Sequence, residues 1–177
     1  MPNGRVTHAE SGGVHVFRYF GRVNYVLAPA IKQFADELVN QGDVRGWVFD
    51  LTQAEILDST NLGLLARLAA RAGSGDEGPA RSIIVSASDD MNSVLRSMRF
   101  DQLFDIVSEP AGAAELAEGA GDEDDADEED IRSADPSARE VGQTMLDAHR
   151  ALMALSEAGR LQFEQVVVAL EAELSGE

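Results

Sequence analysis

The sequence predicts an α/β sandwich, a mixed but mainly parallel sheet with helices packed on it, followed by a C-terminal helical hairpin. Three observations support this. Short apolar runs alternate with helical patterns over residues 1–118, as in an α/β domain with crossover helices. An acidic block then fills residues 119–137, and strong helical periodicity returns over 138–177. We therefore expect a folded domain over 1–118, a linker over 119–137 and a helical hairpin over 138–177.

The first region opens with an expected β-hairpin. Residues 5–9 lead to a turn signal at 10–13. The side chains of residues 14–20 then point alternately to the two faces of a strand, and both faces carry apolar residues. This pattern predicts a strand that is substantially buried on both sides and ends at 21–24.

A helix is expected next, because Pro29 suits a first helical turn and Gly42 suits a helix end. Between them, apolar residues recur at three- and four-residue spacing: Ile31, Phe34, Ala35, Leu38 and Val39. The short apolar run at 47–51, with Asp50 near its end, is typical of a buried parallel strand.

A second helix is expected to start within Asp58-Ser59-Thr60-Asn61, since these are strong N-cap residues. The rest of the domain follows the same alternation: a loop at 73–79, a strand at 82–86, a helix capped at 88–90, a strand at 103–107 and a short helix at 110–118.

The charge balance limits the possible partners. Asp and Glu number 32 against 14 Lys and Arg, giving a net charge of −18. Such a field repels nucleic acid and anionic membrane surfaces, so we expect neither as a partner. The chain has no cysteine, which suits a reducing cytosol, and it has no apolar leader or membrane-spanning run. We expect a cytoplasmic protein.

The linker and the tail have distinct patterns. From Asp122 to Asp130 every residue except Ala126 is acidic, which favours a solvated, disordered linker over a metal-binding cluster. The tail carries two apolar seams at heptad-like spacing, and the first loses its register at Gly159. The first seam consists of Val141, Met145, Ala148, Leu152 and Leu155, and the second of Phe163, Val167, Leu170 and Leu174. We expect Met145, Leu152, Phe163, Val167 and Leu170 to be buried. We expect helices at about 138–157 and 161–174. They either fold onto each other or onto the first domain, or form a docking or self-association module through 138–174, which we slightly favour.

No catalytic or metal-binding constellation is visible. His8, His15 and His149 lie on separate expected elements without metal-ligand spacing, and no phosphate-binding loop follows a strand. Ser59 has no base near it in the sequence, which makes it a poor nucleophile. We therefore expect no enzymatic activity, no metal and no cofactor.

Four local motifs in order resemble the STAS family, the sulfate-transporter and anti-sigma-antagonist domain. They lie at residues 21–24 with 28–29, at 48–51, at 58–65, and at 94–98 with 103–106. The stretch Asp-Ser-Thr-Asn-Leu-Gly at 58–63 resembles the family's phosphorylation signature. Asn24 replaces the usual Asp and Asn61 the usual Gly. The resemblance covers residues 5–118.

The resemblance implies a bacterial anti-sigma factor antagonist that works by partner switching. In such systems the unphosphorylated antagonist binds a GHKL-type serine kinase that is often itself the anti-sigma factor. Phosphorylation of the serine after the Asp releases it, and a PP2C-type phosphatase restores it. By this resemblance Ser59 is the phosphoacceptor. The expected partner-binding residues are Asn24, Asp58, Ser59, Thr60, Asn61 and Leu62. The alternative is a STAS subunit of a membrane transport complex.

The electrostatics at a helix N-terminus also favour a phosphorylation switch at Ser59. We expect the Ser59 hydroxyl to lie at the surface near the helix N-terminus, where backbone N–H groups favour negative charge. A phosphate would add about −1.5 to −2 charges there. Against a net charge of −18 this is a small global change, so its effect must be local.

Overall fold

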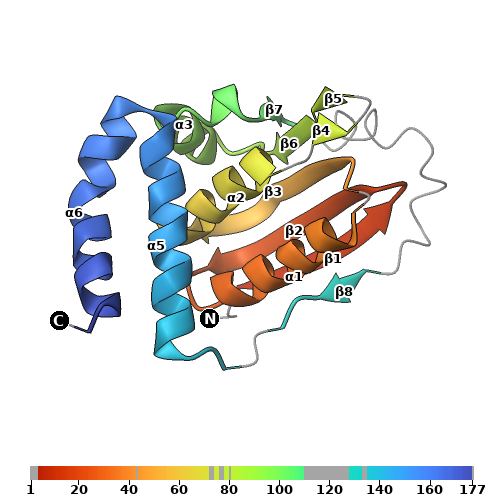
Figure 1. The fold of residues 1–177 in the computed structure, drawn as a ribbon. Coiled ribbons are helices and arrows are strands. Elements are labelled where there is room, and N and C mark those ends of the chain that lie inside the picture. The colour runs from red at the N-terminus through yellow and green to blue at the C-terminus, as the bar shows by residue number, and fades with distance from the viewer. Residues whose placement is uncertain are drawn as a thin grey trace.

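A six-stranded sheet forms the centre of the molecule, in the order β7-β6-β3-β2-β1-β8 (Figure 1). The computed structural model describes residues 4–42, 44–71, 74–75, 78–79, 81–109, 128–132 and 135–176. The strands of the sheet are β1 (Arg5–Ser11), β2 (Val14–Val23), β3 (Gly46–Leu57), β6 (Arg81–Val85), β7 (Asp105–Val107) and β8 (Glu129–Asp130). Strands β2, β3, β6 and β7 run parallel, whereas β1 is antiparallel to β2 and to β8. The predicted mixed, mainly parallel sheet is confirmed. A separate two-stranded ribbon pairs β4 (Ser74–Gly75) with β5 (Gly78–Pro79).

The middle of the sheet is buried on both faces, as the apolar runs predict. Trp47 and Phe49 of β3 are fully buried in the main core, where they stack on one another with ring centroids 6.4 Å apart. Val48 points to the opposite face and packs with Ile83 and Val85 of β6. Alternation along a strand places neighbouring residues on opposite faces, so β3 serves two apolar clusters at once.

Helices α1 (Ala28–Gln41) and α2 (Ser59–Arg71) lie against one face of the sheet (Figure 1). Pro29 stands in the first turn of α1, and Gly42 ends the helix with a φ of 87°, a conformation that glycine adopts without strain. Helix α3 (Asp89–Ser97) begins as expected, since the Ser88 hydroxyl accepts a hydrogen bond from the Met91 N–H.

The closing strand is shorter than predicted. Phe100–Gln102 form a 3-10 turn after Arg99, whose φ is 64°, and β7 starts only at Asp105 rather than at 103. The ring of Phe104 stacks on Phe100 in the core at 5.5 Å, and this packing takes the residue out of the strand. The short helix predicted over 110–118 lies outside the described residues.

The acidic block differs from the expected disordered linker at residues 128–132. Glu129 and Asp130 form β8 against β1, and the Ile131 N–H donates to the Val6 carbonyl at 2.9 Å with the Ile131 side chain buried. Acids of this segment lie near the cations of the first hairpin, with Arg5 Nη1 3.6 Å from Asp130 and Arg18 Nη1 3.4 Å from Glu128. Charge pairing and one buried side chain fix this part of the block.

The C-terminal segment forms the predicted pair of helices, α5 (Ala138–Leu155) and α6 (Glu157–Leu174). The turn lies at Ser156 rather than at Gly159, because the Ser156 hydroxyl caps α6 by accepting from the Gly159 N–H. Gly159 is instead a contact point, since a Cβ built there would lie 2.6 Å from the Leu152 carbonyl oxygen.

The pair packs on the domain through α5, which lies along α2 and touches α1 (Figure 1). The predicted seam is largely buried, with Leu152, Phe163, Val167 and Leu170 covered and Met145 half-buried. Of the two arrangements left open by the sequence, this is the one in which the helices fold onto each other and onto the first domain. None of the helices in the described part of the chain has the length and apolar character needed to cross a membrane.

Candidate functional site

Ser59 is the first residue of α2, directly after the long central strand β3. Asp58 acts as the helix cap. Its carboxylate Oδ1 accepts from the Asn61 N–H at 3.0 Å and from the Asn61 side-chain amide at 2.9 Å. The Asp58 carbonyl accepts the first helical bond, from the Leu62 N–H at 3.0 Å. The cap therefore belongs to Asp58, and the Ser59 hydroxyl is left available for another contact.

That contact is with the C-terminal helix α5. Ser59 Oγ lies 3.0 Å from Nε2 of His149, and Nδ1 of the same ring lies 2.6 Å from the Met145 carbonyl oxygen. A carbonyl only accepts, so the neutral ring carries its proton on Nδ1 and Nε2 accepts from the Ser59 hydroxyl. The expectation of an exposed hydroxyl is wrong: Ser59 is half-buried and its partner His149 is only 3% exposed.

Helix α2 is buried on all sides near Ser59. Every residue from Thr60 to Ala66 is buried, which is almost two helical turns. A helix on a sheet normally buries one stripe, so the opposite face must also be covered, and α5 covers it. The two helices are close: a Cβ built on Gly63 would lie 2.2 Å from the Ala148 carbonyl oxygen.

The predicted partner-binding residues divide into three groups by burial. Asn24 is exposed and lies near Asp58, because the Asp58 N–H donates to the carbonyl of the preceding residue, Val23, at 3.4 Å. The side-chain Oδ1 of Asn24 accepts from the Val26 N–H at 3.1 Å and forms an Asx turn that leads into α1. Asp58 and Ser59 are half-buried. The remaining three, Thr60, Asn61 and Leu62, are buried in this arrangement.

Sequence reasoning missed three exposed apolar side chains beside this group. Tyr25 and Val26 are each 45% exposed and Ile56 is 47% exposed. They flank Asn24 and Asp58 at the carboxyl ends of the parallel strands β2 and β3, since β3 pairs with β2 up to Val23 and Leu57. For Tyr25 and Val26, their place just after the predicted strand end at 21–24 was the available signal.

The three histidines lie on separate elements, as expected, but two of them, His8 and His15, are in contact. His8 Nε2 and His15 Nδ1 are 3.0 Å apart across the first hairpin, and His8 Nδ1 is 3.4 Å from Glu129. Burial lowers the pKa of both imidazoles, more than the neighbouring carboxylates of Glu10 and Glu129 raise it. Among the residues that the structure describes, no cluster of three or more His, Asp or Glu could hold a metal ion.

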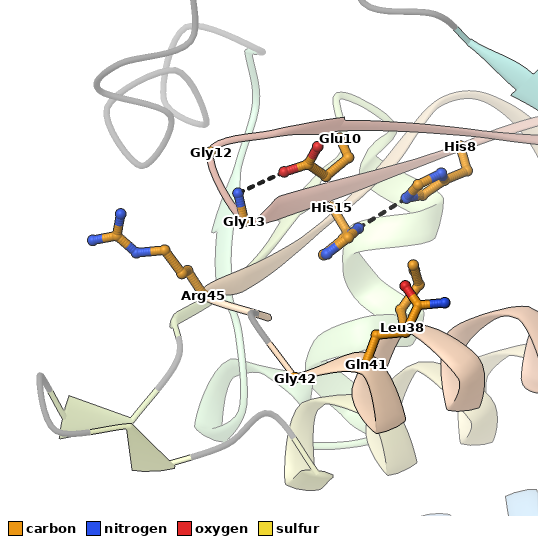
Figure 2. Close-up of a pocket in the computed structure, with 9 residues that line it drawn as sticks. All are labelled: His8, Glu10, Gly12, Gly13, His15, Leu38, Gln41, Gly42 and Arg45. Carbon is orange, nitrogen blue, oxygen red and sulfur yellow. Dashed lines mark hydrogen bonds between the residues drawn. The ribbon is translucent and has the colours of Figure 1, made fainter.

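The histidine pair lines a pocket of about 570 Å³ (Figure 2). Its lining residues come from the turn of the β1–β2 hairpin and the end of α1, together with Glu10 and Arg45, and none of them belongs to α5 or α6 (Figure 2). It contains none of the residues predicted for the switch.

Comparison with known proteins agrees with this architecture. Solved structures share the fold, including these three. An anti-sigma factor antagonist from Mycobacterium paratuberculosis has 21% identity and a TM-score of 0.56, over 65% of this chain and 94% of its own. The phosphorylated form of the Bacillus cell fate determinant SpoIIAA has 17% identity and a TM-score of 0.51, over 63% of this chain and 98% of its own. Unphosphorylated SpoIIAA, an anti-sigma factor antagonist, has 22% identity and a TM-score of 0.50, over 65% and 98%.

A comparison with curated proteins finds no significant match. The STAS domain model matches residues 5–113, which is more than half of the chain and contains both Ser59 and the exposed group around Asn24. The chain therefore belongs to the STAS domain family.

Proposed function

We propose that the protein is an anti-sigma factor antagonist that acts by partner switching, with Ser59 as its phosphoacceptor. The observation that carries this proposal is the position of Ser59 at the start of α2, behind the Asp58 cap and beside the exposed Asn24 loop. The fold is that of solved antagonists, two of them forms of SpoIIAA with and without phosphate. The unphosphorylated chain binds an anti-sigma factor or GHKL-type serine kinase, and a PP2C-type phosphatase reverses the phosphorylation.

The geometry makes charge at Ser59 effective. The N-terminal amides of α2 and its dipole favour an anion at this position, so the phosphate would be tolerated by the domain itself. In a docked interface the same group would add bulk and about −1.5 to −2 charges that need a partner. Release of the kinase then follows from a local clash and an unpaired charge.

We propose that the partner contacts a surface made of the exposed Asn24 loop, Asp58 and Ser59. The half-exposed apolar side chains of Tyr25, Val26 and Ile56 would supply its apolar part. Thr60, Asn61 and Leu62 would act mainly by shaping the start of α2, because they are buried. In this proposal the protein binds no nucleotide of its own and works in the cytoplasm.

The Ser59–His149 hydrogen bond also has the length of a nucleophile–base contact. A hydrolase would need room for a substrate against Ser59 Oγ, but the ring of His149 and the backbone of α5 lie over this end of α2. We therefore infer a contact between helices rather than a catalytic pair. A fluorophosphonate probe, which reacts with activated serines, should leave the full chain unlabelled.

Capture of partners with defined bait variants tests the proposal. Ser59→Ala bait should retain a GHKL-type kinase from native lysate, and Ser59→Asp bait should retain much less of it. The captured kinase with ATP should phosphorylate the unsubstituted chain and Thr60→Ala, but not Ser59→Ala. Mass spectrometry that finds phosphate mainly on Thr60 would refute the assignment. Recovery of a membrane permease and its ATPase in place of the kinase would favour the transport alternative.

A further inference from the structure

We propose that the α5–α6 pair is a cover for the switch face, held in place within the same chain. When docked, it occupies the side of α2 that carries Ser59, and it must leave before a kinase or anti-sigma factor can reach that serine. The regulatory meaning of the cover rests on the proposed function of Ser59. The restricted access to position 59 does not depend on that proposed function.

The first support is the direct contact at the phosphoacceptor. The Ser59 hydroxyl donates to Nε2 of His149 at 3.0 Å, and the Met145 carbonyl fixes the orientation of the ring. The ring also packs edge-on against Phe163 of α6, with centroids 5.4 Å apart. Both helices of the pair therefore position the side chain that covers Ser59, and a phosphoryl donor cannot approach Oγ from that side.

The second support is the closeness of the two helix backbones. The carbonyl oxygen of Ala148 lies where a Cβ of Gly63 would be, so no side chain of another protein fits between α2 and α5. The continuous burial of Thr60 to Ala66 shows the extent of the covered face. A partner that uses this face has to displace α5 rather than bind over it.

The third support is that the pair is an addition to a complete domain. The STAS match ends at residue 113, and the solved relatives are covered almost to their full length by about two thirds of this chain. The pair adds no strand to the sheet. Leu152 and Phe163 of the pair belong to the core of the domain. The pair also has a cluster of its own, in which Leu146 packs with Val167 and Leu170, and an ion pair between Arg150 and Glu171 at 2.5 Å. These internal contacts would keep the two helices together when the pair undocks and exposes Leu152 and Phe163.

Phosphate and the docked cover exclude one another. The phosphoryl group needs the volume that the His149 ring fills, since Nε2 of the ring lies only 3.0 Å from Ser59 Oγ. Linkage makes the effect reciprocal: a docked cover makes the phosphorylated form of Ser59 less favourable, and the phosphate makes docking of the cover less favourable by the same free energy.

A thiol at position 59 measures access without any kinase. The chain has no cysteine, so Ser59→Cys carries a single thiol, and a bulky maleimide reports how often it is uncovered. Ala148→Arg in that background puts a long charged side chain into the buried contact with α2. Ala154→Arg makes the same change on the exposed side of α5 and is the matched control. Ser108→Cys, an exposed position, calibrates the reagent.

We expect the thiol of Ser59→Cys to react at least about tenfold more slowly than the thiol of Ser108→Cys. Adding Ala148→Arg should remove most of that protection, while adding Ala154→Arg should keep it. The emission of Trp47, the one tryptophan in the sequence, should stay that of a buried side chain in all variants. Equal rates for the thiols at positions 59 and 108 would overturn the proposal, as would full protection in the presence of Ala148→Arg with the domain folded.

If Ala148→Arg unfolds, hydrogen exchange on the unsubstituted chain tests the cover instead. Amides of α5 should exchange through an opening that leaves the amides of β2 and β3 protected. If the amides of α5, β2 and β3 exchange only together, in global unfolding, the proposal of an undocking cover is wrong. Phosphorylation by the captured kinase separates the two proposals. Faster phosphorylation of Ala148→Arg than of Ala154→Arg supports the cover as a regulator. Thiol protection lost in Ala148→Arg, with no phosphate on Ser59 in any variant, leaves the cover standing and refutes the switch.

Discussion

The hydrogen bond between Ser59 and His149 should be measurable as a coupling energy. Ser59→Ala does not remove the helix cap, which Asp58 provides. It does leave Nε2 of His149 as a buried acceptor without a partner, because His149 is 3% exposed. An unsatisfied buried group costs about 1–3 kcal/mol, so we expect Ser59→Ala to lower the free energy of unfolding by that amount. For a chain of this size this corresponds to about 2–4 °C in Tm per kcal/mol.

A double-mutant cycle isolates the contact. His149→Phe keeps an aromatic ring against Phe163 but offers no acceptor, so in that background Ser59→Ala should cost about 1 kcal/mol less than in the original chain. Urea unfolding followed by Trp47 fluorescence and by far-UV circular dichroism gives the four free energies. If the two substitutions add within about 0.3 kcal/mol, the hydrogen bond does not contribute and our reading of the Ser59 environment is wrong.

Three further predictions concern stability. Asp58→Ala removes both hydrogen bonds to Asn61 and should cost about 1–2 kcal/mol in urea unfolding, whereas Asp58→Asn, which can still accept, should cost less than half of that. Burial lowers the pKa of His8 and His15, so below the ordinary value of 6.5 the unfolded chain binds protons that the folded chain does not. Stability should therefore fall as pH drops from about 7 to about 5, and a His15→Gln variant whose slope over this range is no shallower would contradict this. Gly42→Ala should cost about 1 kcal/mol in thermal unfolding, because its φ of 87° is unfavourable for alanine; an unchanged Tm would show that the loop adapts.

Much of the fold could be predicted because its signals are local. Pro29 and Gly42 mark the ends of α1, and the run at 47–51 marks the buried first half of β3, although the strand continues to Leu57. The two seams of the tail predict α5 and α6, but they do not predict where the turn between the helices lies. The first seam breaks at Gly159, whereas α6 is capped three residues earlier by Ser156, which the apolar spacing does not indicate.

The environment of the site could not be predicted, because it depends on contacts distant in sequence. Ser59 and His149 are separated by 90 residues, and a single histidine on a helix carries no sign of the serine it will meet. The contact between His8 and His15 was easier to predict, since the two residues flank one predicted hairpin turn. Predicting it also requires the register of that hairpin, which the sequence pattern does not define. Local patterns predict which helix Ser59 begins, whereas only the packed chain shows what covers it.

The short strand β8 covers part of one edge of the sheet. It pairs with Thr7 and His8 of the seven-residue strand β1, whose backbone groups could otherwise pair with another chain at this point. The opposite edge is β7, which has only three residues and offers little to pair with. Acids at 128–130 lie beside Arg5 and Arg18 and hold β8 next to β1, so the protection of this part of the edge is partly electrostatic. Salt screens such contacts, and the acidic stretch of the chain thus makes the resistance of the sheet to edge-to-edge association depend on ionic strength.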